Sequence, residues 1–183
     1  MMQINIISTP IDGLLLFKPA VFTDKRGYFA ETYNHNDLSA VGINHQFVQD
    51  NQSMSHQGAL RGLHFQKPPY AQAKLVRVIM GAVFDVVVDI RKGSKTYGQY
   101  FGAELSSENF LQLYVPEGFA HGFVTLVDNT IFSYKCSTLY NKESEGGLMW
   151  NEPAFNIPWG VTDPQLSEKD TNFISFKEFD SPF

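Results

Sequence analysis

Short β-rich segments separated by turn-forming residues fill most of the chain from Ile4 to Tyr140. β-Branched and aromatic residues favour strands, and glycine, proline, asparagine and aspartate occupy the intervals between them. Strands that follow one another without intervening helices form antiparallel sandwiches or barrels. The expected strands are Gly13–Phe17, Gly27–Tyr33, Phe47–Ser53, Ala59–Gln66, Lys74–Met80, Val83–Ile90, Gln99–Leu105, Phe110–Val115, Ala120–Leu126 and Ile131–Ser137.

Helical patterns are rare in this sequence. Residues Asn36–Val41 form the one helical pattern within the β-rich region, with Asn34 or Asn36 as the N-cap, and a short helix is expected after Leu166. The chain has no linker-like stretch, low-complexity tract or repeat of fixed period. Residues 1–183 are therefore predicted to form one all-β domain with a few short helices.

Composition excludes several classes of function. A net charge of -5 argues against a general nucleic-acid binder, which needs a basic face. No apolar run approaches the roughly 20 residues that cross a bilayer, because Asp85 interrupts the longest one. The N-terminus lacks a signal-like pattern, so a cytoplasmic location is expected. A single cysteine, Cys136, excludes an internal disulfide framework and a cysteine-based zinc cluster.

The segment Phe84–Ile90 alternates with a period of two residues. One face carries Phe84, Val86, Val88 and Ile90, and the other carries two aspartates and a valine. This pattern predicts a strand half-buried against a core. In a small barrel the inner face can hold a ligand, and polar side chains then point inward.

The densest polar cluster in the sequence lies on three expected strands. On a regular strand Gln49 and Asn51 share a face, whereas Arg61 and His64 point to opposite faces. A bulge at Gly62 would bring both toward one pocket. Taken alone, Arg61 is most simply interpreted as a solvated side chain. Taken alone, His64 is most simply interpreted as a partly buried histidine whose hydrogen bonds are satisfied. Their clustering, together with Lys74, favours a functional site.

A second cluster runs from Pro116 to Phe123 and begins with a tight turn. His121 shares a strand face with Phe119 and Phe123, a setting that by itself indicates core packing more often than catalysis.

The spacings Gly58-x5-His64 and Pro116-x-Gly118-x2-His121 resemble the two signature motifs of the cupin superfamily, whose fold is a small antiparallel jelly-roll barrel. Metal-binding cupins carry His-x-His, a later glutamate and a histidine in the second motif. Here Gln66 replaces the second histidine, and no glutamate stands at Tyr70 or Ala71. Two of four ligands are therefore missing, and no metal is expected.

Eight segments, taken in order along nearly the whole chain, resemble the dTDP-4-dehydrorhamnose 3,5-epimerase family within that superfamily. They are Asp24–Glu31, Val48–Asn51, Leu60–Gln66, Lys74–Val78, Phe84–Arg91, Pro116–Phe123, Tyr134–Lys135 and Ser144–Gly146. The resemblance implies an isomerase without a cofactor. It would act on a 4-keto-6-deoxyhexose carried by dTDP and invert C3 and C5, the carbons beside the C4 ketone.

The resemblance also implies four catalytic roles. His64 matches the base, and Asp170 matches the carboxylate that orients it. Lys74 would stabilise the oxyanion at the ketone oxygen. Tyr134 matches the acid that returns a proton on the opposite face, and Tyr140 is a nearby rival for that role.

Substrate-binding roles and a partner follow from the same resemblance. The implied binding residues are Arg26, Glu31, Gln49, Asn51, Arg61, His121, Glu145 and Lys169. Phe22, Tyr28 and Phe29 are candidates for stacking on thymine. A homodimer is implied, and the apolar segments Ile4–Ile7 and Leu14–Phe17 are candidates for crossing to the partner.

Three other functions stay open at this stage. A 3-epimerase or a ketoisomerase acting on a related dTDP-keto sugar would use the same base. A non-catalytic sugar-nucleotide-binding cupin would be expected to lack the base or its partner, yet both are present. A metal-dependent, dioxygenase-like cupin is disfavoured by Gln66.

Overall fold

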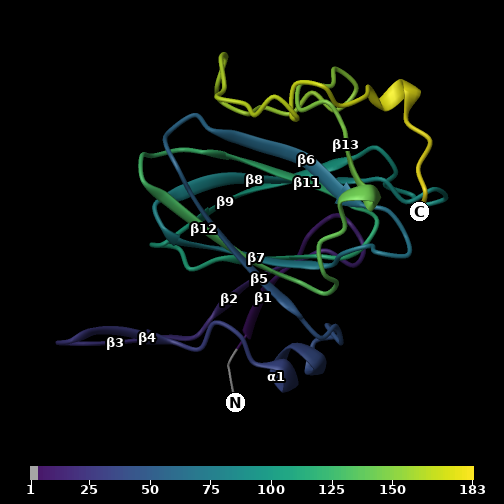
Figure 1. Cartoon of the computed structure of the whole chain (residues 1–183). Coiled ribbons are helices and arrows are strands. Elements are labelled where there is room, and N and C mark those ends of the chain that lie inside the picture. The colour runs from purple at the N-terminus through teal and green to yellow at the C-terminus, as the bar shows by residue number, and fades with distance from the viewer. Residues whose placement is uncertain (1–3) are drawn as a thin grey trace.

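Two antiparallel sheets face each other in the computed structural model, which describes residues 4–183 (Figure 1). The larger sheet has six strands in the order β1-β2-β10-β7-β12-β5, and the smaller has five in the order β13-β6-β11-β8-β9. Strands β3 and β4 form a separate hairpin that extends away from both sheets. This architecture confirms the predicted all-β, cupin-type jelly roll.

The elements follow one another in a simple order. They are β1 (Ile4–Ile7), β2 (Leu15–Pro19), β3 (Val21–Asp24), β4 (Gly27–Ala30), α1 (His35–Ala40), β5 (Gln49–Ser55), β6 (Leu60–Gln66), β7 (Lys74–Met80), β8 (Ala82–Asp89), β9 (Tyr100–Ser106), β10 (Gln112–Val115), β11 (Phe119–Thr125), β12 (Thr130–Cys136) and β13 (Glu145–Gly147), with 3-10 helices at Lys142–Ser144 and Phe176–Glu178.

Each of the ten predicted strands overlaps an observed strand, and three further strands, β1, β3 and β13, were not predicted. β13 has the sequence Glu-Gly-Gly, which favours no strand, and it forms because it pairs with β6. The two apolar segments named as candidates for crossing to a partner form strands within their own chain: β1 pairs with β2, and β2 also pairs with β10.

The helix expected at Asn36–Val41 is α1, and its cap is Asn34. The Asn34 side chain accepts hydrogen bonds from the backbone amides of Asn36 and Asp37. The short helix expected after Leu166 is a single 3-10 turn at Phe176–Glu178.

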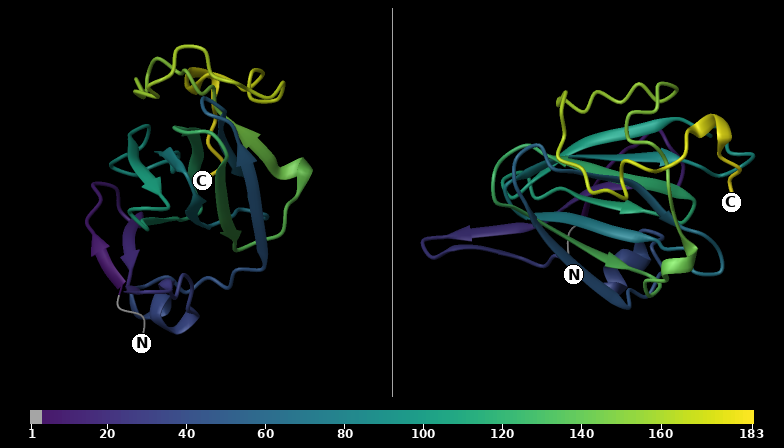
Figure 2. Two further views of the ribbon diagram at one scale, coloured as in Figure 1. Left: turned by 90° about the vertical axis from the view of Figure 1, so that its left-hand side faces the viewer. Right: turned by 45° about the horizontal axis from the view of Figure 1, so that its top comes forward.

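Apolar packing on both faces of the smaller sheet explains the burial of β8. Val83 and Val87 lie in the cluster between the sheets, and Val86 and Val88 lie in a second cluster with Trp159. The predicted half-buried strand is therefore buried on both sides. The covering layer is the C-terminal segment, which runs over the outer face of the smaller sheet (Figure 2).

The pairing of β6 with β11 is irregular where the sequence predicted a bulge. His121 pairs with His64 and Phe123 with Arg61, so β6 advances three residues while β11 advances two. Gly62 lies in this interval with a φ of 138°. The extra residue turns Arg61 and His64 toward the same side, which confirms the expected bulge.

Gly62→Ala tests how tightly this bulge is packed. An added Cβ would lie 2.5 Å from Gly122 Cα and 3.0 Å from the His121 carbonyl oxygen. Overpacking plus the left-handed backbone should lower the free energy of unfolding by about 2–4 kcal/mol. Gly27→Ala is the control, because Gly27 also has a positive φ, 126°, but has no atom within 4 Å of such a Cβ. Denaturant unfolding measures both variants, and equal losses of about 1 kcal/mol would contradict the packing argument.

Candidate active site

A cleft of about 390 Å³ opens between the two sheets. Its lining contains polar and titratable groups together with two phenylalanines from the core. The lining residues are Asn51, Gln52, Ser53, Arg61, His64, Lys74, His121, Phe123, Phe132, Tyr134, Glu145, Ser167, Lys169 and Asp170. All four residues predicted to be catalytic lie here, as do five of the eight predicted to bind substrate.

His64 and Asp170 form the closest pair in the cleft. The His64 Nε2 and Asp170 Oδ1 atoms lie 2.5 Å apart, and the Asp170 residue is only 4% exposed. Burial raises the pKa of the Asp170 carboxyl, but hydrogen bonds from His64 and Ser167 hold it below its usual value. With Nε2 donating to an ionised carboxylate, Nδ1 is the ring nitrogen left to accept a proton.

The pKa of His64 favours a neutral ring. Burial lowers this pKa below its usual value, and the hydrogen bond and charge of Asp170 oppose the effect without reversing it. The ring is thus able to accept a proton at neutral pH, as a general base must.

Tyr134 and Lys74 come from the opposite sheet. Tyr134 lies on β12 and Lys74 on β7, and the Lys74 Nζ atom is 5.9 Å from the centre of the Tyr134 ring. Burial raises the pKa of the Tyr134 phenol, which keeps it protonated. Burial lowers the pKa of the Lys74 ammonium, and among residues 4–183 no carboxylate forms a salt bridge with it.

A second histidine–aspartate pair lies beside the first. The His121 Nε2 atom is 2.9 and 3.0 Å from the two carboxylate oxygens of Asp85, which is fully buried. His121 also pairs directly with His64 across the strands. Sequence reasoning did not select Asp85 as a site residue, although a charge within an apolar run was a usable signal.

The remaining charged groups of the cleft lining have separate partners. Lys169 forms an ion pair with Glu145, whose other oxygen accepts a hydrogen bond from the Tyr140 hydroxyl at 3.0 Å. Arg61 donates from Nε and Nη2 to the Ser55 hydroxyl. Tyr140 is absent from the cleft lining, so Tyr134 is the better-placed of the two candidate acids.

Three of the predicted binding residues do not line the cleft. Gln49 lies next to it and donates to Asn51 Oδ1 at 3.1 Å, as expected for two side chains on one face. Glu31 accepts from Asn34. Arg26 lies on the separate hairpin, exposed, and forms an ion pair with Asp24. Within one chain the structure therefore does not bring Arg26 and Glu31 to the cleft.

Gln66, which replaces a histidine ligand of metal-binding cupins, hydrogen-bonds to the backbone. Gln66 is buried and donates to the carbonyl oxygens of Tyr70 and Leu139, and its Oε1 accepts from the Asn141 amide at 2.8 Å. This side chain is occupied by backbone groups and does not line the cleft. Within the described part of the chain, no group of three or more histidine, cysteine or acidic residues is arranged to hold a metal. These donors do not fit the metal site of other cupins.

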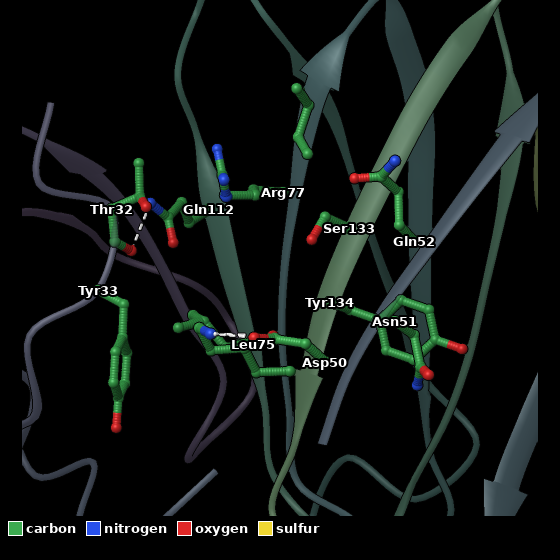
Figure 3. Close-up of a pocket in the computed structure, with 12 residues that line it drawn as sticks. Thr32, Tyr33, Asp50, Asn51, Gln52, Leu75, Arg77, Gln112, Ser133 and Tyr134 are labelled. Carbon is green, nitrogen blue, oxygen red and sulfur yellow. Dashed lines mark hydrogen bonds and ion pairs between the residues drawn. The ribbon is translucent and has the colours of Figure 1, made fainter. Parts of the chain in front are cut away.

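A groove of about 400 Å³ on the outer face of the larger sheet is of similar size (Figure 3). Arg77 and Ser133 line it, an ion pair joins Lys135 to Asp50, and Gln112 donates to the Thr32 carbonyl. Among residues 4–183, no histidine lines this groove. The cleft between the sheets is therefore the site equipped for proton transfer.

Comparison with known proteins gives consistent matches. A family model described as dTDP-4-dehydrorhamnose 3,5-epimerase matches residues 8–178. The chain is 51% identical over 177 residues to dTDP-4-dehydrorhamnose 3,5-epimerase of Shigella flexneri, a match that covers 96% of this chain and 98% of that protein.

Two solved structures are similar in fold and sequence. The dTDP-4-dehydrorhamnose 3,5-epimerase of Bacillus anthracis str. Ames, with TDP and PPi bound, matches with a TM-score of 0.92 and 48% identity, covering 93% of this chain and 98% of that chain. The dTDP-6-deoxy-D-glucose-3,5-epimerase of Legionella pneumophila Philadelphia 1, in complex with dTDP-4-keto-L-rhamnose, matches with a TM-score of 0.93 and 44% identity. This match covers 97% of this chain and 95% of that chain.

Asp170→Asn tests the electrostatic coupling in the first pair. The Asp170 carboxylate raises the pKa of His64 against the effect of burial, so its neutral replacement should lower that pKa further. An NMR titration of the His64 ring measures the shift. Asp163→Asn, at an exposed position of the same C-terminal segment, should leave the titration unchanged. An unaltered or higher His64 pKa in Asp170→Asn would show that the pair is not coupled as described.

Proposed function

The chain belongs to the dTDP-4-dehydrorhamnose 3,5-epimerase family, and we propose how the residues of its cleft perform the family's reaction. It epimerises dTDP-4-keto-6-deoxyglucose at C3 and C5. The observation that carries the proposed mechanism is that the base and the acid come from opposite sheets: His64 from β6, and Tyr134 from β12. A sugar ring lying between the sheets has one group on each face.

His64 is proposed to remove the protons. The carbons C3 and C5 flank the C4 ketone, so loss of either proton gives an enolate. In a glucose ring the hydrogens on C3 and C5 are axial on the same face, and one base on that face serves both carbons. Asp170 stabilises the imidazolium that forms. Proton transfer by a positioned group contributes roughly 10²–10⁴-fold to the rate.

Lys74 is proposed to stabilise the developing oxyanion at C4. It is a half-buried cation, and within residues 4–183 it forms no salt bridge. A fixed positive charge in a water-poor cleft favours negative charge that appears only in the transition state and the enolate. Its unpaired state in the free protein leaves it available for this role.

Tyr134 is proposed to return a proton on the opposite face, which inverts the carbon. The raised pKa of its phenol keeps the proton available at neutral pH. After each inversion the base holds a proton and the phenol lacks one, so both must be restored before the next carbon is inverted.

Arg61 and Lys169 are proposed to bind the diphosphate. Both are cations at the cleft, and arginine offers a planar, bidentate donor. The structure of the Bacillus anthracis relative, with TDP and PPi bound, supports an anion-binding role for such a cleft. Asn51, His121 and Glu145 supply further hydrogen-bonding groups, and Gln49 orients Asn51.

A homodimer accounts for the residues that one chain does not bring together. The β3–β4 hairpin carries Phe22, Tyr28 and Phe29, which are 65%, 61% and 68% exposed, together with Arg26 at its turn. Exposed aromatic residues of this number favour burial against another chain. We propose that the hairpin reaches the cleft of a second copy and delivers Arg26 there, with the aromatic residues available to stack on thymine.

Domain organisation and location were also predicted from the sequence. The cleft draws residues from Asn51 to Asp170, which supports one functional domain over the chain. No helix within residues 4–183 has the length and apolarity to span a bilayer. The cytoplasmic location stays a prediction from the sequence.

Incubation with dTDP-4-keto-6-deoxyglucose in deuterated water tests the chemistry. The wild-type protein should introduce deuterium at both C3 and C5, because each proton is removed and replaced in turn. His64→Ala should abolish exchange at both carbons. NMR of the recovered sugar gives the label at each position. Label at C3 alone would indicate a 3-epimerase, and wild-type exchange in His64→Ala would refute the role of His64.

Tyr134→Phe separates the two half-reactions in the same assay. Removal of the hydroxyl should leave some exchange, since the base is intact, while reducing inversion. Equal losses of exchange and inversion would contradict a role confined to reprotonation.

Co-expression of Arg26→Ala with His64→Ala tests the hairpin. Each variant alone should be strongly impaired. In a mixed dimer, the chain that keeps His64 receives Arg26 from its partner, so about a quarter of the wild-type activity should return when chains pair at random. Light scattering should give the mass of two chains. A monomeric mass, or no recovery of activity from mixed dimers, would contradict the proposal.

A further inference from the structure

Ser167 lies on the solvent side of the carboxylate that orients the base. Its hydroxyl donates to Asp170 Oδ2 at 2.6 Å and accepts from the Asp170 backbone amide at 3.2 Å. Asp170 Oδ1 faces His64 Nε2 on the other side. Ser167 therefore joins a continuous chain of three side chains that ends at the base.

The two carboxylate oxygens of Asp170 thus have different partners. Oδ1 holds the imidazole, and Oδ2 holds a hydroxyl from the same turn, so the carboxylate cannot rotate without breaking one of the two bonds. A donor to an ionised carboxylate also favours the ionised form. Both effects act on His64 only through Asp170.

Other residues stabilise the turn itself. The Thr171 hydroxyl and the Asn172 side chain each donate to the Glu168 carbonyl oxygen at 2.7 Å, and the Asn172 amide donates to the Lys169 carbonyl. None of these bonds involves the Asp170 side chain. The turn therefore keeps most of its own hydrogen bonds when the Ser167 hydroxyl is removed.

From this arrangement we propose that Ser167 is a positioning residue of the epimerase reaction: its hydroxyl fixes the orientation and the ionised state of Asp170, and thereby the proton affinity of His64. The inference rests on the proposed role of His64 as the base. Ser167 also lines the cleft. Its position makes it the third member of a Ser167–Asp170–His64 chain.

The pH dependence of kcat/KM is the readout that a merely structural serine would not move. Without the hydroxyl, the Asp170 carboxylate loses a hydrogen bond that stabilises its negative charge. The carboxylate then attracts the proton on the His64 ring more strongly, so the pKa of His64 should rise. Ser167→Ala should therefore move the acidic limb of the profile to higher pH, by about one unit for a single hydrogen bond to a charged group. Ser167→Thr keeps a hydroxyl at an exposed position and should restore the wild-type limb.

Thr171→Ala is the matched control, because it removes a hydrogen bond of the same turn that does not involve Asp170. Its acidic limb should stay at the wild-type position. An unmoved limb in Ser167→Ala, or an equal movement in Thr171→Ala, would overturn the proposal. The wild-type protein and His64→Ala, assayed alongside, show separately whether His64 is the base.

Discussion

The hydrogen bond between His64 and Asp170 joins parts of the chain that are 106 residues apart, and the orientation of the His64 ring depends on it. His64 lies on β6 of the smaller sheet, whereas Asp170 lies in the C-terminal segment that covers the outer face of that sheet. Trp159 and Phe155 of this segment pack against Val86 and related residues in one buried cluster. Apolar packing on the outer face of the sheet therefore holds the segment that carries Asp170 against β6, and with it the geometry of the His64–Asp170 hydrogen bond.

Each carboxylate that lines the cleft, and the buried Asp85 behind it, has a hydrogen-bond or ion-pair partner before substrate binds. Asp170 is paired with His64, Asp85 with His121, and Glu145 with Lys169. Pairing reduces the cost of removing a charge from water, which an isolated buried ion would bear in full. Lys74 and Arg61 differ, since among residues 4–183 no carboxylate forms a salt bridge with either cation. These two cations are therefore free to interact with the negative charges of the substrate, and the proposed role of Lys74 at the oxyanion makes use of this.

Much of this organisation was predictable from the sequence, for physical reasons. Period-two alternation located the strands, and Gly62 located the bulge that places Arg61 beside His64. Ser167 gave no signal, since a serine in a polar stretch is ordinary and its importance comes from a contact with Asp170. For the β3–β4 hairpin the sequence suggested a site residue that the fold of one chain does not place in the cleft. The family resemblance pointed to Arg26, yet folding of one chain leaves that residue outside the cleft. Local sequence patterns give no information on where a second chain would lie.

Gln66 shows how this barrel differs from its metal-binding relatives in the cupin superfamily. Gln66 stands where metal-binding cupins have a second histidine ligand. Its side-chain amide hydrogen-bonds to the backbone of Tyr70, Leu139 and Asn141. Those bonds fix the loop that carries Tyr140, whose amide in turn donates to Gln49. A histidine could not supply the same pattern, because a neutral imidazole has one donor and one acceptor. The residue that stands in place of a metal ligand thus helps to position Gln49, which in turn donates to Asn51 in the cleft lining. The positive charge that a metal would have supplied to the enolate is the role proposed for Lys74.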